Sequence, residues 1–445
     1  MRKWVLPALV VALLAPLLRT EYPGSWGAHI GPPVIFGADE EAYLLLVNSV
    51  IRDGDLDLKN NHGEVMLGAR EAGGKNAGRI LDHHSTYYVN GERKVWRDLV
   101  DPRVYLWPRD ARGVPQFVFK PGLDPALAAG PEYSAHPVGV ALLLAPLMWP
   151  FANTDLVEPM TLLWSGLATV AALFCLRSIL RQMGGTEGAI QLTLVAAFLG
   201  TPLWYYGRAF FNESFVTLAV LGAYAVILRP RGALAAGAIV AAGMLMKPQL
   251  ALLCLPLAIP ALRQRSWRGL LALGVFPVAA LGLLLWLNHH MYGSITRGPY
   301  PFSWGNPLEA LWGEMVQKEK GLLWFAPAVL FAVLGWPALW REKREYSAMI
   351  LGGFALFFGL VMCWVDWGGG WCYGPRLVAP VLPLLAVGLV RALELPLMQK
   401  AAMKWAFRVV LVWACVVNGF AATTYWYAWH RFPTEFIALS LGLKH

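Results

Sequence analysis

Charged residues are scarce in this chain of 445 residues, where they make up only 15% while hydrophobic residues make up 57%. The mean hydropathy of +0.49 lies well outside the range of an ordinary soluble globular domain. The composition therefore excludes a soluble enzyme and predicts an all-α polytopic membrane protein.

Sequence motifs for disulfides, zinc and soluble catalysis are also missing. The five cysteines show neither a paired spacing nor a CxxC, so no disulfide framework or zinc site follows from them. The chain has no Walker loop, no GxGxxG that opens a helix after a strand, and no GxSxG. An enzyme built on this chain must therefore take its activated substrate from the membrane or from outside.

Lys and Arg exceed Asp and Glu by 37 to 28, which gives a formal charge of +9. A nucleic-acid-binding protein gathers basic residues on a soluble face. Here they form small clusters between apolar runs, as in membrane proteins whose cytoplasmic loops are basic. The charge predicts helix orientation, and no nucleic-acid partner is expected.

Eleven apolar runs are long enough to cross a membrane, some of them with the help of tilt. They fall near residues 4–18, 158–178, 188–206, 213–228, 232–247, 249–262, 269–289, 321–340, 346–365, 376–393 and 405–425. The first run follows Arg2 and Lys3 and could instead be a signal peptide, but no small-x-small cleavage site follows it cleanly. The topology below needs this run as a helix.

A twelfth run at 137–151, with proline at both ends and inside and no basic residue at either end, decides the topology. If it does not span, every basic cluster falls on the side of the N-terminus, and if it spans, most clusters after it fall on the other side. These clusters contain Arg177, Arg181, Arg229, Arg231, Arg263, Arg265, Arg268, Arg341, Lys343, Arg344, Arg391, Lys400 and Lys404. We therefore interpret 137–151 as an interfacial or re-entrant helix and place the N-terminus in the cytoplasm.

This topology divides the chain into a first helix at 1–18, a large extracytoplasmic loop at 19–157 and ten further helices within 158–425, followed by an outer tail at 426–445. Outer loops fall at 207–213, 290–320 and 366–375. In the large loop, EEAYLLLVNSVIRDG has the pattern of an amphipathic helix, and TYYVNGERKVW predicts a hairpin that turns at Asn-Gly.

Polar residues gather at the outer ends of the predicted helices. Ionisable residues there are costly unless they face water or a partner, which makes them candidates for function. They are Asp39, Glu40 and Glu41 in GADEEAY, with His136, Arg208, Glu213, Lys247, His289, His290, Asp366 and Arg376. Taken singly, each is explained by snorkelling or by an ordinary interfacial hydrogen bond, but their convergence at one depth predicts a pocket at the outer surface.

The segment WGGGWCYGPR combines glycines, aromatic rings and an arginine. Its glycines permit close approach of a ligand to the backbone, while Trp367, Trp371 and Tyr373 offer flat faces that stack on sugars. The alternative is an aromatic turn at the membrane interface. Arg376 suits a phosphate because its guanidinium is a fork of donors.

Two acidic or histidine-rich stretches suggest a metal only weakly. Asp53, Asp55, Asp57 and Glu64 match four positions of a calcium loop, but Leu58 stands where the sharp turn needs glycine. His83 and His84 follow Asp82, although adjacent histidines in a surface loop more often bind no metal. No cofactor is assigned, and a divalent metal stays an open alternative.

Several stretches taken in order resemble the GT-C glycosyltransferases, and most of all their protein O-mannosyltransferase and aminoarabinose-transferase branch. The matching stretches are GADEEAYLLLVNSVIRDGD, EYSAHPVGVALLLAP, TPLWYYGRAFFNESF, LMKPQ, NHHMYGS, GLLWFAPAVL and WGGGWCYGPRLVAPVLPLLA. The resemblance runs through most of the chain. It departs from the family at LMKPQ, where relatives often have Thr-Lys-Gly, and at residues 60–130, where nothing matches.

The resemblance implies the GT-C fold in a bacterial inner membrane and an inverting transfer of a sugar from a polyprenyl-phosphate donor to a lipid, glycan or protein acceptor at the outer face. It implies that Asp39 is the general base, and we take the neighbouring Glu40 as a second catalytic candidate, a supporting or acceptor-binding carboxylate. His136, Glu213 and Tyr43 would shape the active site or bind the acceptor. The donor phosphate would be bound by Lys247, Arg376 and Arg208, and sugar or lipid contacts would come from Trp367, Trp371, Tyr373, His289 and His290.

Two alternatives remain at this point. A ligase could move a whole glycan from a polyprenyl-diphosphate, and the sequence does not exclude it. A lipid-linked sugar transporter or flippase usually has internal repeats and charge at the midplane, whereas this chain shows no convincing repeat and collects its charges at one surface.

Overall fold

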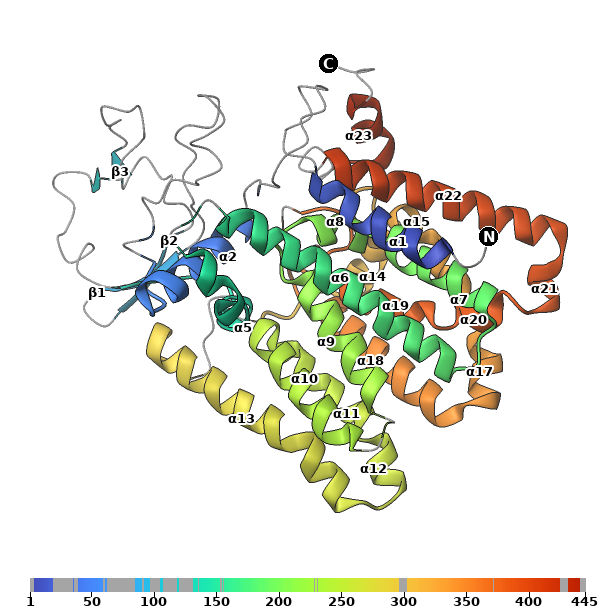
Figure 1. The fold of residues 1–445 in the computed structure, drawn as a ribbon, viewed down its shortest axis with the longest axis horizontal. Helices are drawn as coiled ribbons and strands as arrows, with labels where there is room; N and C mark the ends of the chain where they lie inside the picture. Colours follow the sequence, from blue (N-terminus) through green and yellow to red (C-terminus); the bar gives the residue numbers. More distant parts are fainter. Residues whose placement is uncertain are drawn as a thin grey trace.

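The computed structural model is a bundle of helices in the part of the chain that it describes (Figure 1). The described residues are 4–18, 35, 39–58, 61, 85–89, 92–96, 105–106, 118–119, 131–134, 136–152, 154, 156–227, 229, 231–295, 302–370, 372–424 and 431–440. Among them, four helices are long and apolar enough to cross a membrane: α6 (Val157–Gln182), α13 (Trp267–Tyr292), α18 (Arg344–Met362) and α22 (Ala401–Thr424). The predicted all-α membrane architecture is confirmed, while the number of spans stays a prediction.

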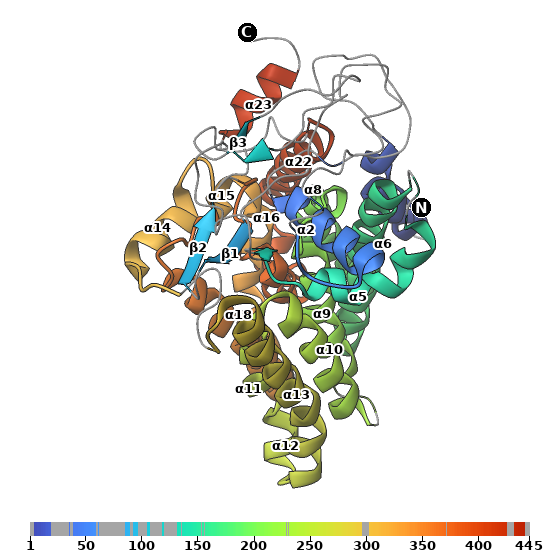
Figure 2. The same ribbon diagram turned by 90° about the vertical axis from the view of Figure 1, so that its left-hand side faces the viewer.

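Helices α6, α9 (Glu213–Val226), α10 (Gly232–Met246) and α13 pack against one another in that order, with α13 along the outer edge of the bundle in Figure 1 (see also Figure 2). Small residues allow this close packing. A Cβ added at Gly237 would lie 2.3 Å from the carbonyl oxygen of Leu273, so α10 and α13 meet backbone to backbone there. The opposite face of α13 exposes large apolar side chains, including Leu271 and Val278, as a lipid-facing helix does.

Several predicted spans are broken into short helices, and proline lies at many of the breaks. The run 249–262 becomes η6 (Pro248–Leu253), α11 (Cys254–Leu257) and α12 (Ile259–Arg263). The run 321–340 becomes α15 (Leu322–Phe325), α16 (Pro327–Leu330), η7 (Phe331–Leu334) and α17 (Trp336–Glu342). The run 376–393 contains η8 (Ala379–Val381), α19 (Leu382–Ala386) and α20 (Leu389–Ala392).

The remaining helices complete the bundle and its outer parts. They are α1 (Val5–Leu14), η2 (Ala15–Leu18), α7 (Glu187–Leu194), η5 (Val195–Leu199), α8 (Leu203–Arg208), α14 (Pro307–Val316), α21 (Pro396–Gln399) and α23 (Pro433–Ser440).

The extracytoplasmic loop predicted from the sequence contains the expected helix and hairpin, but the helix is not amphipathic, because the residues from Ala42 to Val47 are all buried. The helix is α2 (Asp39–Asn48), which continues into a π-helical turn, Ser49–Asp53. The hairpin pairs β1 (Ser85–Val89) with β2 (Glu92–Trp96), and β5 (Glu132–Ser134) adds to β1 in the order β2-β1-β5. A two-stranded sheet joins β3 (Tyr105–Leu106) to β4 (Val118–Phe119).

The run at 137–151 forms α5 (Gly139–Met148) followed by η4 (Trp149–Phe151). Helix α5 packs against α2 and against the end of α10. Gly139 touches the α10 backbone directly, because a Cβ there would lie 2.2 Å from the carbonyl carbon of Leu245. At ten residues α5 is shorter than a span, and its position relative to the membrane stays a prediction.

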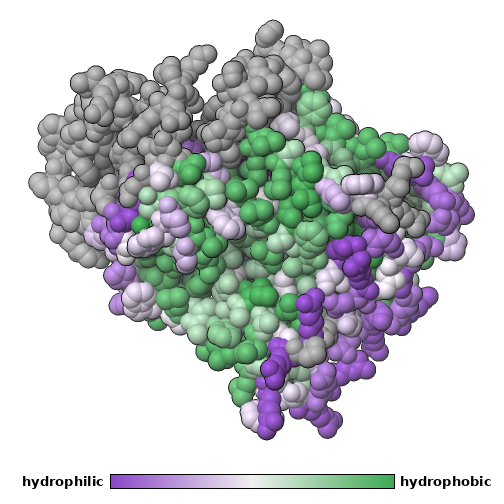
Figure 3. Space-filling model, in the orientation of Figure 1, coloured by the Kyte–Doolittle hydropathy of each residue, from purple (hydrophilic) through white to green (hydrophobic). Residues whose placement is uncertain are grey.

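Polar side chains collect at the end of the bundle formed by α12, α17, α20 and α21, next to a broad apolar face (Figure 3). Basic clusters that are far apart in the sequence meet there. Arg391 donates to the Gly184 carbonyl at 3.0 Å, and Arg263 pairs with Glu345 at 2.8 Å. The structure thus gathers these clusters at one end, as the positive-inside argument requires, while the membrane side of that end stays a prediction.

Candidate active site

Helix α2 begins with two neighbouring acids that have different surroundings. Glu40 is fully buried, and its Oε1 accepts the backbone N–H of Phe210 at 2.7 Å, which ties α2 to the segment after α8. Asp39 precedes it by one residue, or about 100° around the helix, and its side chain is 16% exposed. Asp39 is therefore the acid that a substrate can reach, while Glu40 holds the helix in place. The side chain of Glu41 lies outside the described residues.

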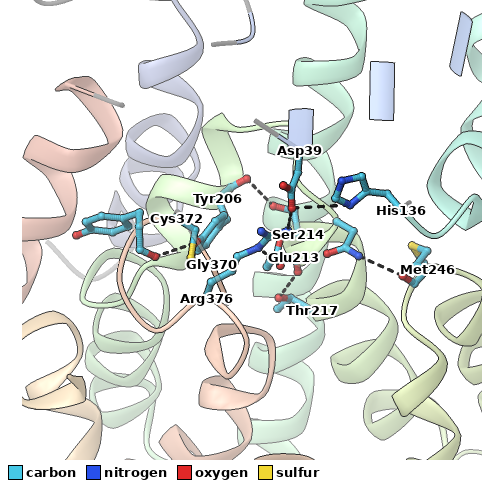
Figure 4. Close-up of polar contacts among 12 residues, drawn as sticks. Asp39, His136, Tyr206, Glu213, Ser214, Thr217, Met246, Gly370, Cys372 and Arg376 are labelled. Atoms are coloured by element: carbon cyan, nitrogen blue, oxygen red, sulfur yellow. Dashed lines mark hydrogen bonds and ion pairs between the residues drawn. The ribbon is translucent and has the colours of Figure 1, made fainter. Parts of the chain in front are cut away.

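Arg376 lies between two carboxylates from distant parts of the chain (Figure 4). Its Nη2 is 2.5 Å from Asp39 Oδ2, and its Nε donates to Glu213 Oε1 at 2.8 Å. The guanidinium also lies over the ring of Phe211, 4.5 Å from the centroid. The planar fork of arginine allows it to bind both acids in one geometry, which a lysine cannot reproduce.

His136 and Tyr43 lie on one side of Asp39. The Nδ1 of His136 is 3.9 Å from Asp39 Oδ2, and the residue is only 5% exposed. Tyr43 lies four residues after Asp39 on the same helix face, and its ring centroid is 5.3 Å from that of His136. The structure thus brings together three residues that the sequence offered separately.

Glu213 is the first residue of α9, where the helix dipole favours a carboxylate. It is 1% exposed, and its Oε2 has no hydrogen-bond partner among the described residues. Helix α9 is fixed at this end, because Ser214 donates to the Tyr206 carbonyl at 2.9 Å. Arg376 therefore meets a carboxylate whose position is set by the helix packing.

Lys247 follows the last residue of α10 in an extended conformation, with φ −150°. The residue is 8% exposed, its Nζ lies 5.6 Å from the ring centroid of Phe357, and it has no hydrogen-bond acceptor within the described ranges. Asn212, next to Glu213, donates to the carbonyl of Met246, next to Lys247, at 3.1 Å. A buried ammonium group without an acceptor is costly, and it lies where an anion would satisfy it.

The other predicted donor-binding and contact residues differ in their positions. Arg208 ends α8 and is buried, with 2% exposure. His289 and His290 are exposed at the end of α13. The ring of His290 stacks on that of Trp286, with 5.5 Å between the centroids. His290 also lies near Tyr133, with 6.0 Å between the ring centroids. The contact of either histidine with a sugar or lipid stays a prediction.

The aromatic residues of WGGGWCYGPR do not all present free faces. Tyr373 is fully buried, and its ring centroid lies 4.7 Å from that of Tyr205. Its hydroxyl donates a hydrogen bond to Asn418 Oδ1 at 2.9 Å. The predicted stacking of Tyr373 on a sugar therefore does not fit this structure, because protein atoms already cover its ring. Trp367 packs on α14, where a Cβ added at Gly313 would lie 2.0 Å from its ring. Trp371 lies outside the described residues.

Two buried ionisable residues near this segment, Lys320 and Glu314, were not predicted from the sequence. Lys320 Nζ donates to the carbonyls of Gly370 and Cys372 at 3.1 and 3.0 Å, and so fixes the glycine-rich turn. Glu314 is 1% exposed, and burial raises its pKa to about 8 although Lys320 partly opposes the shift. The only signal in the sequence was a group of charged residues, EMVQKEK, in the loop predicted at 290–320.

The described residues contain no group of three or more His, Cys, Asp or Glu side chains that could hold a metal. Two acids of the suspected calcium loop accept hydrogen bonds from nearby side chains. Asp53 accepts from Asn61 at 2.7 Å, and Asp55 accepts from Ser49 at 2.9 Å. Glu64, Asp82, His83 and His84 lie outside the described residues. A divalent metal therefore stays an untested alternative.

The fold and this site define a polytopic helical protein of the GT-C fold class with a buried carboxylate–arginine centre. No protein-family model matches the sequence, and no curated protein matches it. Two solved structures of ArnT from Cupriavidus metallidurans share the fold, one bound to undecaprenyl phosphate and one in the apo state. They have TM-scores of 0.52 and 0.51, both are 14% identical, and both matches cover 99% of this chain and 70% of ArnT. The fold expected from the resemblance is confirmed.

Proposed function

We propose that this protein is an inverting glycosyltransferase that moves a sugar from a polyprenyl-phosphate carrier to a lipid, glycan or protein acceptor. The observation that carries the proposal is one buried centre that contains the reachable carboxylate of Asp39, the guanidinium of Arg376 and the amine of Lys247, which has no hydrogen-bond acceptor among the described residues. A base and two cations are what this reaction needs. The likeness to ArnT, with its bound undecaprenyl phosphate, supports the choice of carrier.

The reaction is a single displacement. Asp39 takes the proton of the acceptor hydroxyl while the acceptor oxygen forms a bond to the anomeric carbon of the sugar. The bond between that carbon and the carrier phosphate breaks, and the leaving phosphate keeps the electron pair. Arg376 and Lys247 stabilise the negative charge that grows on the phosphate, and attack opposite to the leaving group inverts the configuration.

The ion pair between Arg376 and Asp39 gives the donor a second role. With Arg376 bound to Asp39 at 2.5 Å, the carboxylate is engaged and is a poor proton acceptor. A donor phosphate competes for the same guanidinium and releases Asp39, while Glu213 keeps hold of the Nε side of Arg376. The base thus becomes free only when the donor is in place, which disfavours proton transfer without a sugar to move.

The residues next to Asp39 indicate where the acceptor would bind. His136 and Tyr43 flank the carboxylate away from Arg376 and would position the acceptor hydroxyl. Glu213 begins α9, whereas the basic residues Arg229 and Arg231 follow its end, so the centre and this basic cluster lie at opposite ends of the helix. We therefore place the active site on the extracytoplasmic face of a bacterial inner membrane, with the N-terminus in the cytoplasm.

The test is mass spectrometry of cell-surface glycolipids and glycans from cells with and without the gene. We expect one sugar residue to be missing without the gene, and to return with the wild-type gene but not with Asp39→Asn. Loss of a whole oligosaccharide together with accumulation of its diphosphate carrier would instead indicate a ligase. Restoration by Asp39→Asn would contradict the assignment of the base.

A further inference from the structure

A pocket lies at the end of α9 that is remote from the carboxylate centre. Glu213 begins α9 and Arg229 follows its end, and a helix of 14 residues is about 21 Å long. The pocket has a volume of about 660 Å³, within the range of small-molecule sites. Its walls come from three segments: the last turns of α6, the turn between α9 and α10, and the start of α18.

Three arginines line the pocket, namely Arg177, Arg181 and Arg229. Glu187 pairs with two of them, at 3.0 Å from Arg177 and 3.6 Å from Arg181. One acid against three guanidinium groups leaves the pocket with an excess of two positive charges. Such a pocket attracts an anion, and the planar fork of arginine suits the oxygens of a phosphate.

The rest of the lining also suits a phosphate that carries an apolar chain. Ser178, Gln182 and Tyr346 bring further hydrogen-bonding groups to the pocket. Arg229 already donates to Ser178 Oγ at 3.3 Å, which holds its side chain toward the pocket. Phe174 lies one helical turn before Arg177 and Ser178 on α6, and 46% of it is exposed. An apolar surface therefore adjoins the charged one.

We propose that this pocket binds the phosphate headgroup of an anionic membrane phospholipid. Basic pockets between membrane helices are typical sites for such headgroups, and Phe174 would lie against the start of an acyl chain. The bound lipid would join α6, the turn after α9 and α18, which are separate in the sequence. A free phosphate offers the same oxygens but has no apolar chain for Phe174.

Native mass spectrometry and thermal unfolding of the purified full-length protein in detergent micelles test the proposal. Phosphatidylglycerol should remain bound as a discrete adduct and raise Tm, whereas phosphatidylcholine should do neither. Inorganic phosphate at the same concentration should leave Tm unchanged. Equal effects of the two lipids, or an equal effect of inorganic phosphate, would overturn the assignment of a lipid headgroup.

The variant Arg181→Gln/Arg229→Gln removes two pocket charges and leaves the pair of Arg177 and Glu187 intact. Its matched control, Arg341→Gln/Lys404→Gln, removes two exposed charges that do not line the pocket. We expect at least a tenfold loss of phosphatidylglycerol affinity in the pocket variant alone, with unchanged circular dichroism in both. Equal affinity in the two variants would show that lipid binding does not use the pocket. These measurements need no sugar transfer, so they stand apart from the proposed function.

Discussion

The Nη2 of Arg376 lies 2.5 Å from Asp39 Oδ2, although 337 positions separate the two residues in the sequence. The Nε of the same guanidinium lies 2.8 Å from Glu213 Oε1. One positive charge therefore pairs with two carboxylates, and this group of three side chains has a net charge of −1 when both acids are ionised. Lys247 is buried close by and has no acceptor in the described part of the chain, and Asn212, next to Glu213, donates to the carbonyl of Met246, next to Lys247.

Asp39→Asn should abolish sugar transfer while leaving the fold intact. Asparagine keeps the shape of the side chain and one acceptor oxygen for Arg376 but cannot take a proton, and loss of a general base typically slows a reaction by about 10²- to 10⁴-fold. Transfer is measured by mass spectrometry of the product, and folding by Tm in detergent. Near-normal transfer would show that another group is the base.

Glu40→Ala is the matched comparison, because it changes the neighbouring acid. It leaves the buried N–H of Phe210 without its acceptor at 2.7 Å, and an unsatisfied buried donor costs about 1–3 kcal/mol. We therefore expect a lower Tm and poorer expression, with transfer per folded molecule reduced less than in Asp39→Asn. Unchanged Tm would show that Glu40 does not hold α2.

Arg376→Lys should impair both stability and donor binding, although it conserves the charge. A lysine cannot bind Asp39 and Glu213 together, and the poorly paired carboxylate of Glu213 is 1% exposed. Breaking a buried pair typically costs about 3–5 kcal/mol. We expect a lower Tm and a raised KM for the lipid-phosphate donor. A change in Tm alone, with an unaltered KM, would leave Arg376 as a structural residue.

Lys247→Met should separate stability from activity. Methionine fills a similar volume and removes a buried amine that has no acceptor in the described structure, so Tm should stay unchanged or rise. Transfer should fall, because the donor phosphate loses a cation, and the KM for the donor should rise. A variant with both a lower Tm and normal transfer would reverse this assignment.

The sequence predicted the helical class and a helix at Asp39, because apolar runs are local properties, but not the burial of this helix on all sides. It did not predict the breaks around Pro248 and Pro327, since mean hydropathy does not register a lost backbone hydrogen bond. Nor could it pair Arg376 with Asp39, because that contact depends on how α2 packs against distant helices. Tyr373 was misjudged for the same reason: burial is a property of the whole fold.

We expect Glu314 to make the stability of the protein depend on pH. Burial raises its pKa to about 8 in the folded state, against 4.5 for the ordinary group. Between these two values the folded chain holds a proton that the unfolded chain has lost, so the stability from this group is complete below pH 4.5 and is lost as the pH rises through 8. Each pH unit within that window weakens folding by at most about 1.4 kcal/mol.

Glu314→Gln keeps a neutral side chain of the same shape and removes the titration. We expect the Tm of the wild type to fall relative to this variant as the pH rises from 5 to 9, with the two close together at the acid end. The control is Glu309→Gln on the same helix α14, which is exposed and should follow the wild type. Parallel curves for all three proteins would show that Glu314 does not hold its proton in the folded state, and that Lys320 compensates a carboxylate there instead.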